Sequence, residues 1–89
     1  MHMTKRDKLI KRLLQRPANF EYDEARTLLI RFGYSEENRG RTSGSRVAFV
    51  NSKTGHIIRL HKPHPENTLK RYQLNQLIEE LQKQGVIKT

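Results

Sequence analysis

The sequence predicts an α+β domain of two layers, with amphipathic helices on one face of a small antiparallel sheet. Apolar residues recur at helical spacing near both ends of the chain, and two β-rich runs lie between them. A short connection between these runs fits a hairpin. The chain has 89 residues, which is enough for one small domain. We therefore expect two helices, then two or three strands, then a final helix.

The first two predicted helices precede the strands. Residues 4–16 carry an apolar stripe at helical spacing, and Pro17 ends the pattern. A second helix starts at Tyr22, with acidic residues in its first turn that complement the helix dipole, and Gly33 provides its stop. The apolar positions are Leu9, Ile10, Leu13 and Leu14 in the first helix and Ala25, Leu28, Leu29 and Phe32 in the second. Each helix should bury one face and expose the other.

The middle of the chain predicts a β-hairpin. Residues 45–51 and 55–61 are rich in β-branched and aromatic side chains, and residues 52–54 form the turn between them. The polar stretch 36–44 is expected to be mainly loop, with room for one short strand before the hairpin. Alternation puts Val47, Phe49, Ile58 and Leu60 on the face toward the helices, and Arg46, Ala48, Arg59 and His61 on the other. The second face is therefore basic.

The last predicted helix follows a break in the chain. Prolines at 63 and 65 prevent the second run from continuing as a strand, because proline lacks a backbone N–H. After them, Asn67 or Thr68 is expected to cap a helix that Gly85 ends. Its apolar stripe consists of Leu74, Leu77, Ile78 and Leu81. This helix should pack on the same face of the sheet as the second helix.

Composition excludes several classes of function. The chain has no cysteine, so it has neither a disulfide framework nor a thiolate metal site, and its four scattered histidines leave little for a zinc centre. We expect no metal and no other cofactor. No stretch is long and apolar enough to cross a membrane, and no secretory signal is visible. We therefore expect a cytoplasmic protein without a membrane partner.

Positive charge is concentrated in parts of the chain. Eighteen Lys and Arg against nine Asp and Glu give a net charge of +9, which favours polyanions and above all nucleic acid. Residues 38–65 hold six basic residues and no acidic one, whereas residues 21–37 carry a net charge of −3. Arg46, Arg59 and Lys62 are candidates for binding phosphate, and the simpler alternative is a solvated charged surface. The basic first helix has three open interpretations: contact with RNA, contact with an acidic partner, or solubility alone.

Three short patterns in this order resemble a known family. Residues 22–34 read Tyr-Asp-Glu-Ala-x-x-Leu-Leu-x-x-Phe-Gly-Tyr, residues 44–49 read Gly-Ser-Arg-x-x-Phe, and a Pro-His-Pro turn at 63–65 precedes the last helix. From Glu21 to Gly85 the chain resembles the HicA toxins of bacterial toxin–antitoxin systems. The resemblance implies a double-stranded-RNA-binding-domain-like sandwich with the order α-β-β-β-α. It also implies cleavage of messenger RNA that arrests translation, and neutralisation by a HicB-like antitoxin.

In this resemblance, Arg46 occupies the position of the family's usual catalytic histidine. Arginine binds phosphate and stabilises negative charge, but it stays protonated and cannot act as a general base. His61 and His64 are therefore the candidates for proton transfer in metal-independent RNA cleavage, since imidazole titrates near neutral pH. For both, the alternative is a surface or turn residue without a catalytic role. The predicted RNA-binding set consists of Arg41, Ser45, Arg46, Arg59 and Lys62.

The expected organisation is an N-terminal basic helix with its connector over residues 1–20, followed by the HicA-like domain over residues 21–89. We expect His56 to have no site role, and Tyr22 and Tyr72 to lie at the edge of the core. Three functions stay open at this point: an RNA-cleaving toxin, a module that binds RNA without cutting it, and an interaction module for an acidic protein partner.

Overall fold

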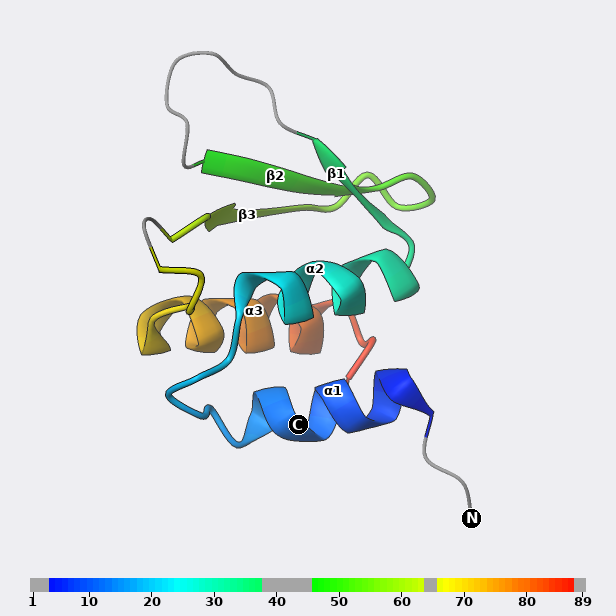
Figure 1. The fold of residues 1–89 in the computed structure, drawn as a ribbon. Coiled ribbons are helices and arrows are strands. Elements are labelled where there is room, and N and C mark those ends of the chain that lie inside the picture. The colour runs from blue at the N-terminus through cyan, green and yellow to red at the C-terminus, as the bar shows by residue number, and fades with distance from the viewer. Residues whose placement is uncertain (1–3, 38–45, 64–65, 88–89) are drawn as a thin grey trace.

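The computed structural model describes residues 4–37, 46–63 and 66–87. In chain order the elements are α1 (Lys5–Leu14), α2 (Tyr22–Arg31), β1 (Tyr34–Glu37), β2 (Arg46–Asn51), β3 (Ile57–His61) and α3 (Arg71–Lys83). The sheet lies on one side of α2 and α3, and α1 lies on the other side of this helix pair (Figure 1). The predicted α+β class and order of elements are confirmed.

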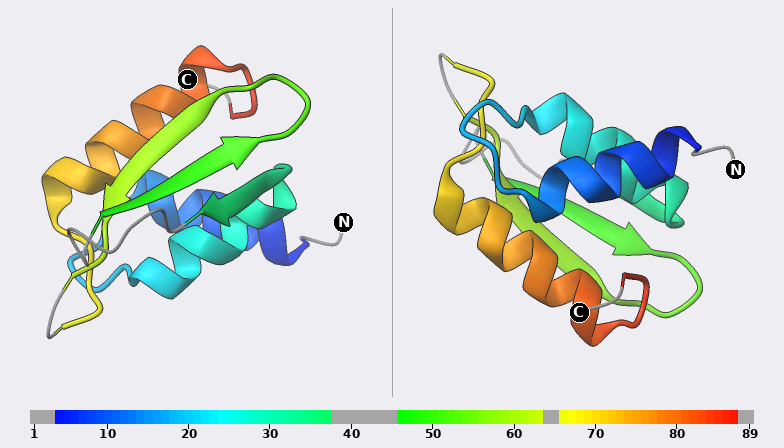
Figure 2. Two further views of the ribbon diagram at one scale, coloured as in Figure 1. Left: turned by 90° about the horizontal axis from the view of Figure 1, so that it is seen from above. Right: turned by 90° about the horizontal axis from the view of Figure 1, so that it is seen from below.

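The three strands form one antiparallel sheet in the order β1-β2-β3. Across β2 and β3, Val47 pairs with Leu60 and Phe49 with Ile58, as expected for the inner face. A short strand before the hairpin is present, but β1 begins two residues before the stretch 36–44 in which it was expected, and it pairs with β2 along its whole length. Seen from above, the described helices all lie behind the sheet (Figure 2, left). One face of the sheet is therefore not covered by any of these helices.

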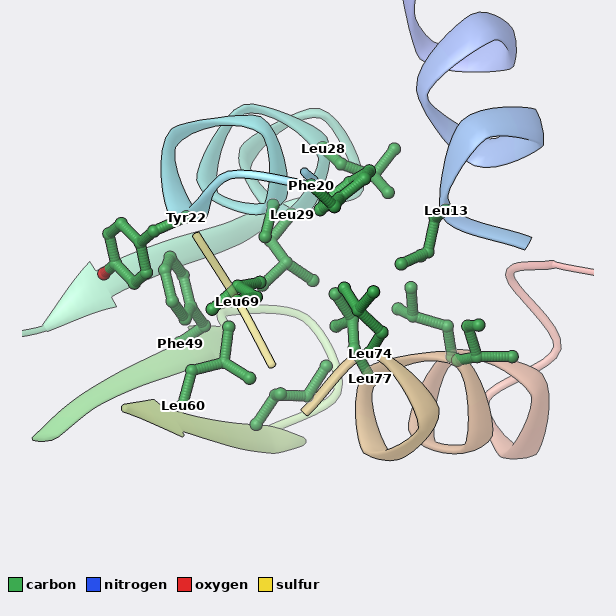
Figure 3. Packing of buried hydrophobic residues seen from close by; sticks show 14 of the residues in the cluster. Leu13, Phe20, Tyr22, Leu28, Leu29, Phe49, Leu60, Leu69, Leu74 and Leu77 are labelled. Carbon is green, nitrogen blue, oxygen red and sulfur yellow. The ribbon is translucent and has the colours of Figure 1, made fainter. Parts of the chain in front are cut away.

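The hydrophobic core lies between the sheet and the helix pair α2 and α3. The four inner-face residues of the hairpin are at most 5% exposed. Leu28 and Leu29 of α2 and Leu74 and Leu77 of α3 are equally buried (Figure 3). The apolar stripes predicted from the sequence thus form the helix faces of the core, because burial of apolar surface is the main force that favours folding.

The helix α1 adds a third layer on the far side of α2 and α3. Leu13 is fully buried and points into the space between these two helices (Figure 3), whereas Leu14 is 37% exposed. The side chain of Arg12 fastens α1 to α2, with its Nε 2.7 Å from Oε2 of Glu24. The stripe predicted for this helix is therefore narrower than expected, since one of its four leucine and isoleucine positions faces outward.

The final helix begins later than predicted. Its N-cap residue is Lys70, so the expectation that Asn67 or Thr68 caps the helix is wrong. Thr68 instead pairs with Glu21 in an antiparallel bridge, and Leu69 is buried at 2% exposure. Backbone pairing with the chain before α2 keeps this segment extended, and that pairing is invisible to local capping rules.

Gly33 turns the chain from α2 into β1. Its φ is +99°, a region that residues with a Cβ rarely adopt. Its N–H donates to the carbonyl oxygen of Ile30 at 3.0 Å and so closes the last turn of the helix. Gly85 has a φ of +73° after α3. Both predicted glycine stops are confirmed.

Candidate functional site

The uncovered face of the sheet brings three of the predicted residues together. Arg46 and His61 are directly paired across β2 and β3, and Ala48 and Arg59 are the next pair on the same face. Directly paired residues have Cβ atoms about 4.5–5.5 Å apart, and diagonal neighbours such as Arg46 and Arg59 lie about 7–8 Å apart. All three charged or titratable side chains are exposed. We call Arg46, Arg59 and His61 the basic cluster.

The basic cluster combines two guanidinium groups with one imidazole. Guanidinium groups bind phosphate oxygens with two N–H donors at once, and an imidazole takes up or gives a proton near neutral pH. Ala48 lies beside the cluster on the same face, with a small side chain. The arrangement is therefore suited to holding a phosphodiester and moving a proton beside it.

The strand β1 brings a carboxylate to the same face, which sequence analysis missed. Glu37 pairs with Ala48, and Ala48 pairs with Arg59, so the three form a row across the sheet. Residues 38–65 contain no acidic residue, but β1 adds the carboxylate of Glu37 to the sheet face that carries the basic cluster. The only signal for this in the sequence is a Glu-Glu pair at 36–37 in a polar stretch, which by itself does not indicate a strand.

Two glutamines of α3 hold the edge strand β3, which carries two of the three cluster residues. Gln73 Oε1 accepts a hydrogen bond from the backbone N–H of His61 at 2.8 Å. Gln76 Nε2 donates to the backbone oxygen of Arg59 at 3.3 Å. These bonds pair backbone groups at the outer edge of the sheet and fix the chain beneath two of the three cluster residues.

Lys62 lies apart from the basic cluster. Its Nζ is 5.6 Å from the ring centre of Tyr22, within cation–π distance. The hydroxyl of Tyr22 donates to Glu36, which also accepts a 2.7 Å hydrogen bond from Arg26 Nε. Lys62 is thus directed toward a network that joins α2 to β1, and the structure does not bring it to the face of Arg46 and Arg59.

The charges in this network perturb each other's protonation. Burial raises the pKa of the Tyr22 hydroxyl, and its hydrogen bond to Glu36 raises the pKa further. Burial by itself would raise the pKa of the Glu36 carboxyl, but hydrogen bonds from Tyr22 and Arg26 outweigh burial and lower the pKa. Glu36 is therefore held as a carboxylate, which suits a structural acceptor better than a proton carrier.

His56 is held between two side chains at the opposite end of β3 from the basic cluster. Its Nδ1 is 2.7 Å from the hydroxyl of Tyr34, and its Nε2 is 2.9 Å from Oε1 of Glu80. The imidazole thus connects the hairpin to both β1 and α3. We assign it a structural role, consistent with the expectation that it is not part of a site.

The two tyrosines singled out from the sequence behave differently. Tyr22 is 1% exposed and packs its ring 6.2 Å from that of Phe49. Tyr72 is 58% exposed on the first turn of α3, so the expectation that it lies at the core edge is wrong. Helical spacing places residue 72 one position before the buried pair at 73–74, which turns it outward.

Some expectations fall outside the part of the chain that the structure describes. Arg41, Ser45 and His64 lie in the segments 38–45 and 64–65, so their positions relative to the basic cluster stay predictions. Within the described ranges, no group of three or more His, Asp and Glu side chains could hold a metal ion. No helix in those ranges is long and apolar enough to cross a membrane.

Comparison with known proteins identifies the family. Residues 22–83 match the family model described as the HicA toxin of bacterial toxin–antitoxin systems. The chain belongs to the HicA toxin family. The match spans α2 to α3 and contains the basic cluster, whereas α1 precedes it. Searches of curated proteins and of solved structures gave no match.

As a member of the HicA family, this protein is the toxin of a toxin–antitoxin system, and an antitoxin partner follows from that membership. The α+β fold predicted from the resemblance agrees with the three helices and the three-stranded antiparallel sheet. The basic cluster is the candidate site on that fold.

Proposed function

We propose that this HicA-family toxin is an mRNA interferase, an endoribonuclease that cuts messenger RNA and thereby arrests translation in the cytoplasm. The observation that carries the proposal is the register of β2 and β3, which pairs Arg46 with His61 beside Arg59 on the uncovered face. Family membership supplies the toxin role. The net charge of +9 supplies a general attraction to the phosphate backbone.

The proposed reaction needs only groups that this chain carries, together with water. His61 removes the proton of a ribose 2′-hydroxyl, and the resulting oxygen attacks the adjacent phosphorus. Arg46 and Arg59 stabilise the negative charge that builds on the phosphate oxygens. The bond to the 5′-oxygen then breaks, and that oxygen takes a proton from His64 or from water. The products are a 2′,3′-cyclic phosphate and a free 5′-hydroxyl, and no metal ion takes part.

Binding without cutting is the second candidate. It is favoured by Arg46, because a residue that stays protonated occupies the position where the family usually has a histidine. In this case the basic cluster grips the backbone and the toxin acts by blocking messenger RNA. The two candidates share the surface and differ only in whether His61 transfers a proton.

We further propose that the antitoxin is a HicB-like protein with an acidic surface that covers the basic cluster. Occlusion of this face would block RNA access whether the toxin cuts or only binds. An interaction module for an acidic partner is therefore compatible with both candidates. A small acidic open reading frame beside this one, whose product co-purifies with the chain, would support this assignment.

A cleavage assay on a long RNA tests the proposal. Wild-type protein should cut the RNA in the presence of EDTA, and it should leave a 2′-O-methyl version of the same RNA intact. His61→Ala should slow cleavage by about 10²–10⁴-fold, the usual contribution of a general base. Lys53→Ala, which removes a cation from the hairpin turn, is the matched control and should cut at the wild-type rate.

The outcomes separate the candidates. Equal cleavage by the wild type and by a His61→Ala, His64→Ala double variant would remove the histidine assignment. Tight, salt-dependent binding without cleavage would select the second candidate. Absence of both binding and cleavage would refute a role in RNA metabolism.

A further inference from the structure

A basic groove opens beside the basic cluster, between the N-terminal segment and the start of α3. It has a volume of about 720 Å³ and is lined by residues from three places: the connector after α1, the chain after β3, and the first turn of α3. We call it the α3 groove. His61 belongs both to its lining and to the basic cluster, so the groove and the cluster meet at this residue.

The charges of the groove favour an anion. Four basic side chains line it, namely Arg16, Lys62, Lys70 and Arg71, against the single carboxylate of Glu66. Within the described residues, no carboxylate forms an ion pair with Lys70 or Arg71. The first turn of α3 carries no acidic residue and its N-cap makes no side-chain hydrogen bond. In the described part of the chain, no carboxylate therefore pairs with these two cations, and no side chain caps the N-terminus of α3.

Arg16 is held in place as one wall of the groove. Its Nε donates to Oδ1 of Asn75 in α3 at 2.6 Å, and its Nη1 donates to the carbonyl oxygen of Leu14 at 3.1 Å. These bonds tie the connector to the helix that forms the opposite wall. Arg16 is also the one non-glycine residue of the described ranges with a positive φ, at 51°. The guanidinium is thus positioned before any ligand arrives.

A mostly buried amide among the lining residues has a partner for its oxygen but none for its nitrogen. Gln73 is 3% exposed and lines the groove, and its Oε1 is occupied by the N–H of His61. None of the described residues accepts a hydrogen bond from its Nε2. Since no fully buried side-chain nitrogen in the described ranges lacks a partner, this Nε2 keeps some exposure to solvent. It offers a donor to an oxygen of a ligand.

The aromatic ring of Tyr72 decides which anion fits. The side chain is 58% exposed and belongs to the lining, next to Arg71 in the sequence. An exposed ring beside unpaired cations is the combination that binds single-stranded nucleic acid, because bases stack on the ring while phosphates contact the cations. An acidic peptide would use the cations and leave the ring without a function.

We infer that the α3 groove is a nucleotide subsite for single-stranded RNA, in which Tyr72 stacks one base and Lys70, Arg71 and Arg16 contact the flanking phosphates. The inference rests on the proposed function, because the same strand would continue from the groove onto the basic cluster. Arg16 comes from the N-terminal segment, which lies outside the family match. The N-terminal extension thus contributes one wall of an RNA path that the family domain alone would lack.

Equilibrium binding to a fluorescein-labelled, 12-nucleotide 2′-O-methyl RNA tests the inference, because this probe has no free 2′-hydroxyl and stays uncut. Tyr72→Leu should weaken binding about 5- to 150-fold, which corresponds to the stacking of one base on an aromatic ring. Tyr72→Phe keeps the ring and should bind like the wild type. Arg71→Ala should weaken binding and flatten the slope of log affinity against log salt by about 0.7.

Two controls accompany these variants. Arg31→Ala removes an exposed cation at the end of α2, and its affinity should stay within twofold of the wild type. Tyr72→Trp introduces the only tryptophan of the chain, and its fluorescence should be quenched by the RNA but not by inorganic phosphate. Circular dichroism melting of every variant checks that it is folded.

The outcomes distinguish the RNA subsite in the α3 groove from the proposed function. If wild-type protein fails to bind the probe, both the groove and the proposed function are refuted. If Arg59→Ala weakens binding but Tyr72→Leu does not, the groove is refuted and the proposed function stands. If Tyr72→Leu releases a co-purified antitoxin and leaves RNA affinity unchanged, the groove is a protein-binding surface and the inference is wrong.

Discussion

Truncation of Leu13 tests whether α1 is an integral layer of this toxin. Leu13→Ala removes a fully buried side chain at the contact of α1 with α2 and α3. Leucine-to-alanine changes at such sites cost about 2–5 kcal/mol, and we expect about 3 kcal/mol of unfolding free energy here. For a domain of this size, that loss lowers the melting temperature by about 12–24 °C.

The neighbouring residue provides the matched control. Leu14→Ala makes the same chemical change in the same helix at a position that is 37% exposed, and it should cost less than about 1 kcal/mol. The gain in helix propensity from leucine to alanine is the same at both positions, so the difference between the two variants isolates burial. Urea unfolding followed by circular dichroism at 222 nm measures both. Equal costs, or a cost below about 1 kcal/mol for Leu13→Ala, would refute the docking of α1.

Three further measurements follow from other contacts. Burial by itself would raise the pKa of the Glu24 carboxyl, but hydrogen bonds from Arg12 and from the backbone outweigh burial and lower the pKa. The ionised Glu24 therefore stabilises the fold above its unfolded-state pKa, and this stabilisation is lost as pH falls through its folded-state pKa. Acid titration of stability should therefore be shallower in Glu24→Gln than in the wild type, and an unchanged curve would contradict the assignment. Gly33→Ala should cost about 1–2 kcal/mol, because its φ of +99° strains any residue with a Cβ, whereas among the described residues the added methyl group meets Asn51 alone, at an ordinary contact distance of 3.6 Å; a neutral result in thermal melts would argue against that backbone conformation. Arg46→Ala should reduce the slope of log RNA affinity against log salt by about 0.7, and an unchanged slope would show that Arg46 makes no phosphate contact.

Much of the fold could be predicted because it follows from local periodicity. The period-two spacing of Val47 and Phe49 predicts which face of β2 meets the helices, and the same holds for Ile58 and Leu60 in β3. The start of α3 could not be predicted in this way. Thr68 has the side chain of a helix cap but is paired in backbone to Glu21, 47 positions earlier in the chain. Capping rules describe neighbours in sequence and do not include such a partner.

In the candidate site, too, some positions follow from local periodicity and others only from contacts between elements. Arg46, Arg59 and His61 share a face because the side-chain period of a strand is two, and the sequence was sufficient to predict this. Glu37 reaches that face only because β1 pairs with β2. The direction of Lys62 toward Tyr22 depends in turn on where the packing of α2 places the Tyr22 ring. Each of these two positions depends on a contact between elements, and periodicity within one element carries no information about it.

By itself, the sequence determined the class of the fold, the basic hairpin and the resemblance to HicA toxins, because composition, alternation and short motifs are properties of consecutive residues. Only the tertiary structure decided that Leu13 is buried while Leu14 is exposed, and that Tyr72 stands at the mouth of a basic groove. The groove joins the connector after α1 to the first turn of α3, which lie more than 50 residues apart in the chain. Packing of distant elements creates such a surface, and no stretch of consecutive residues encodes it.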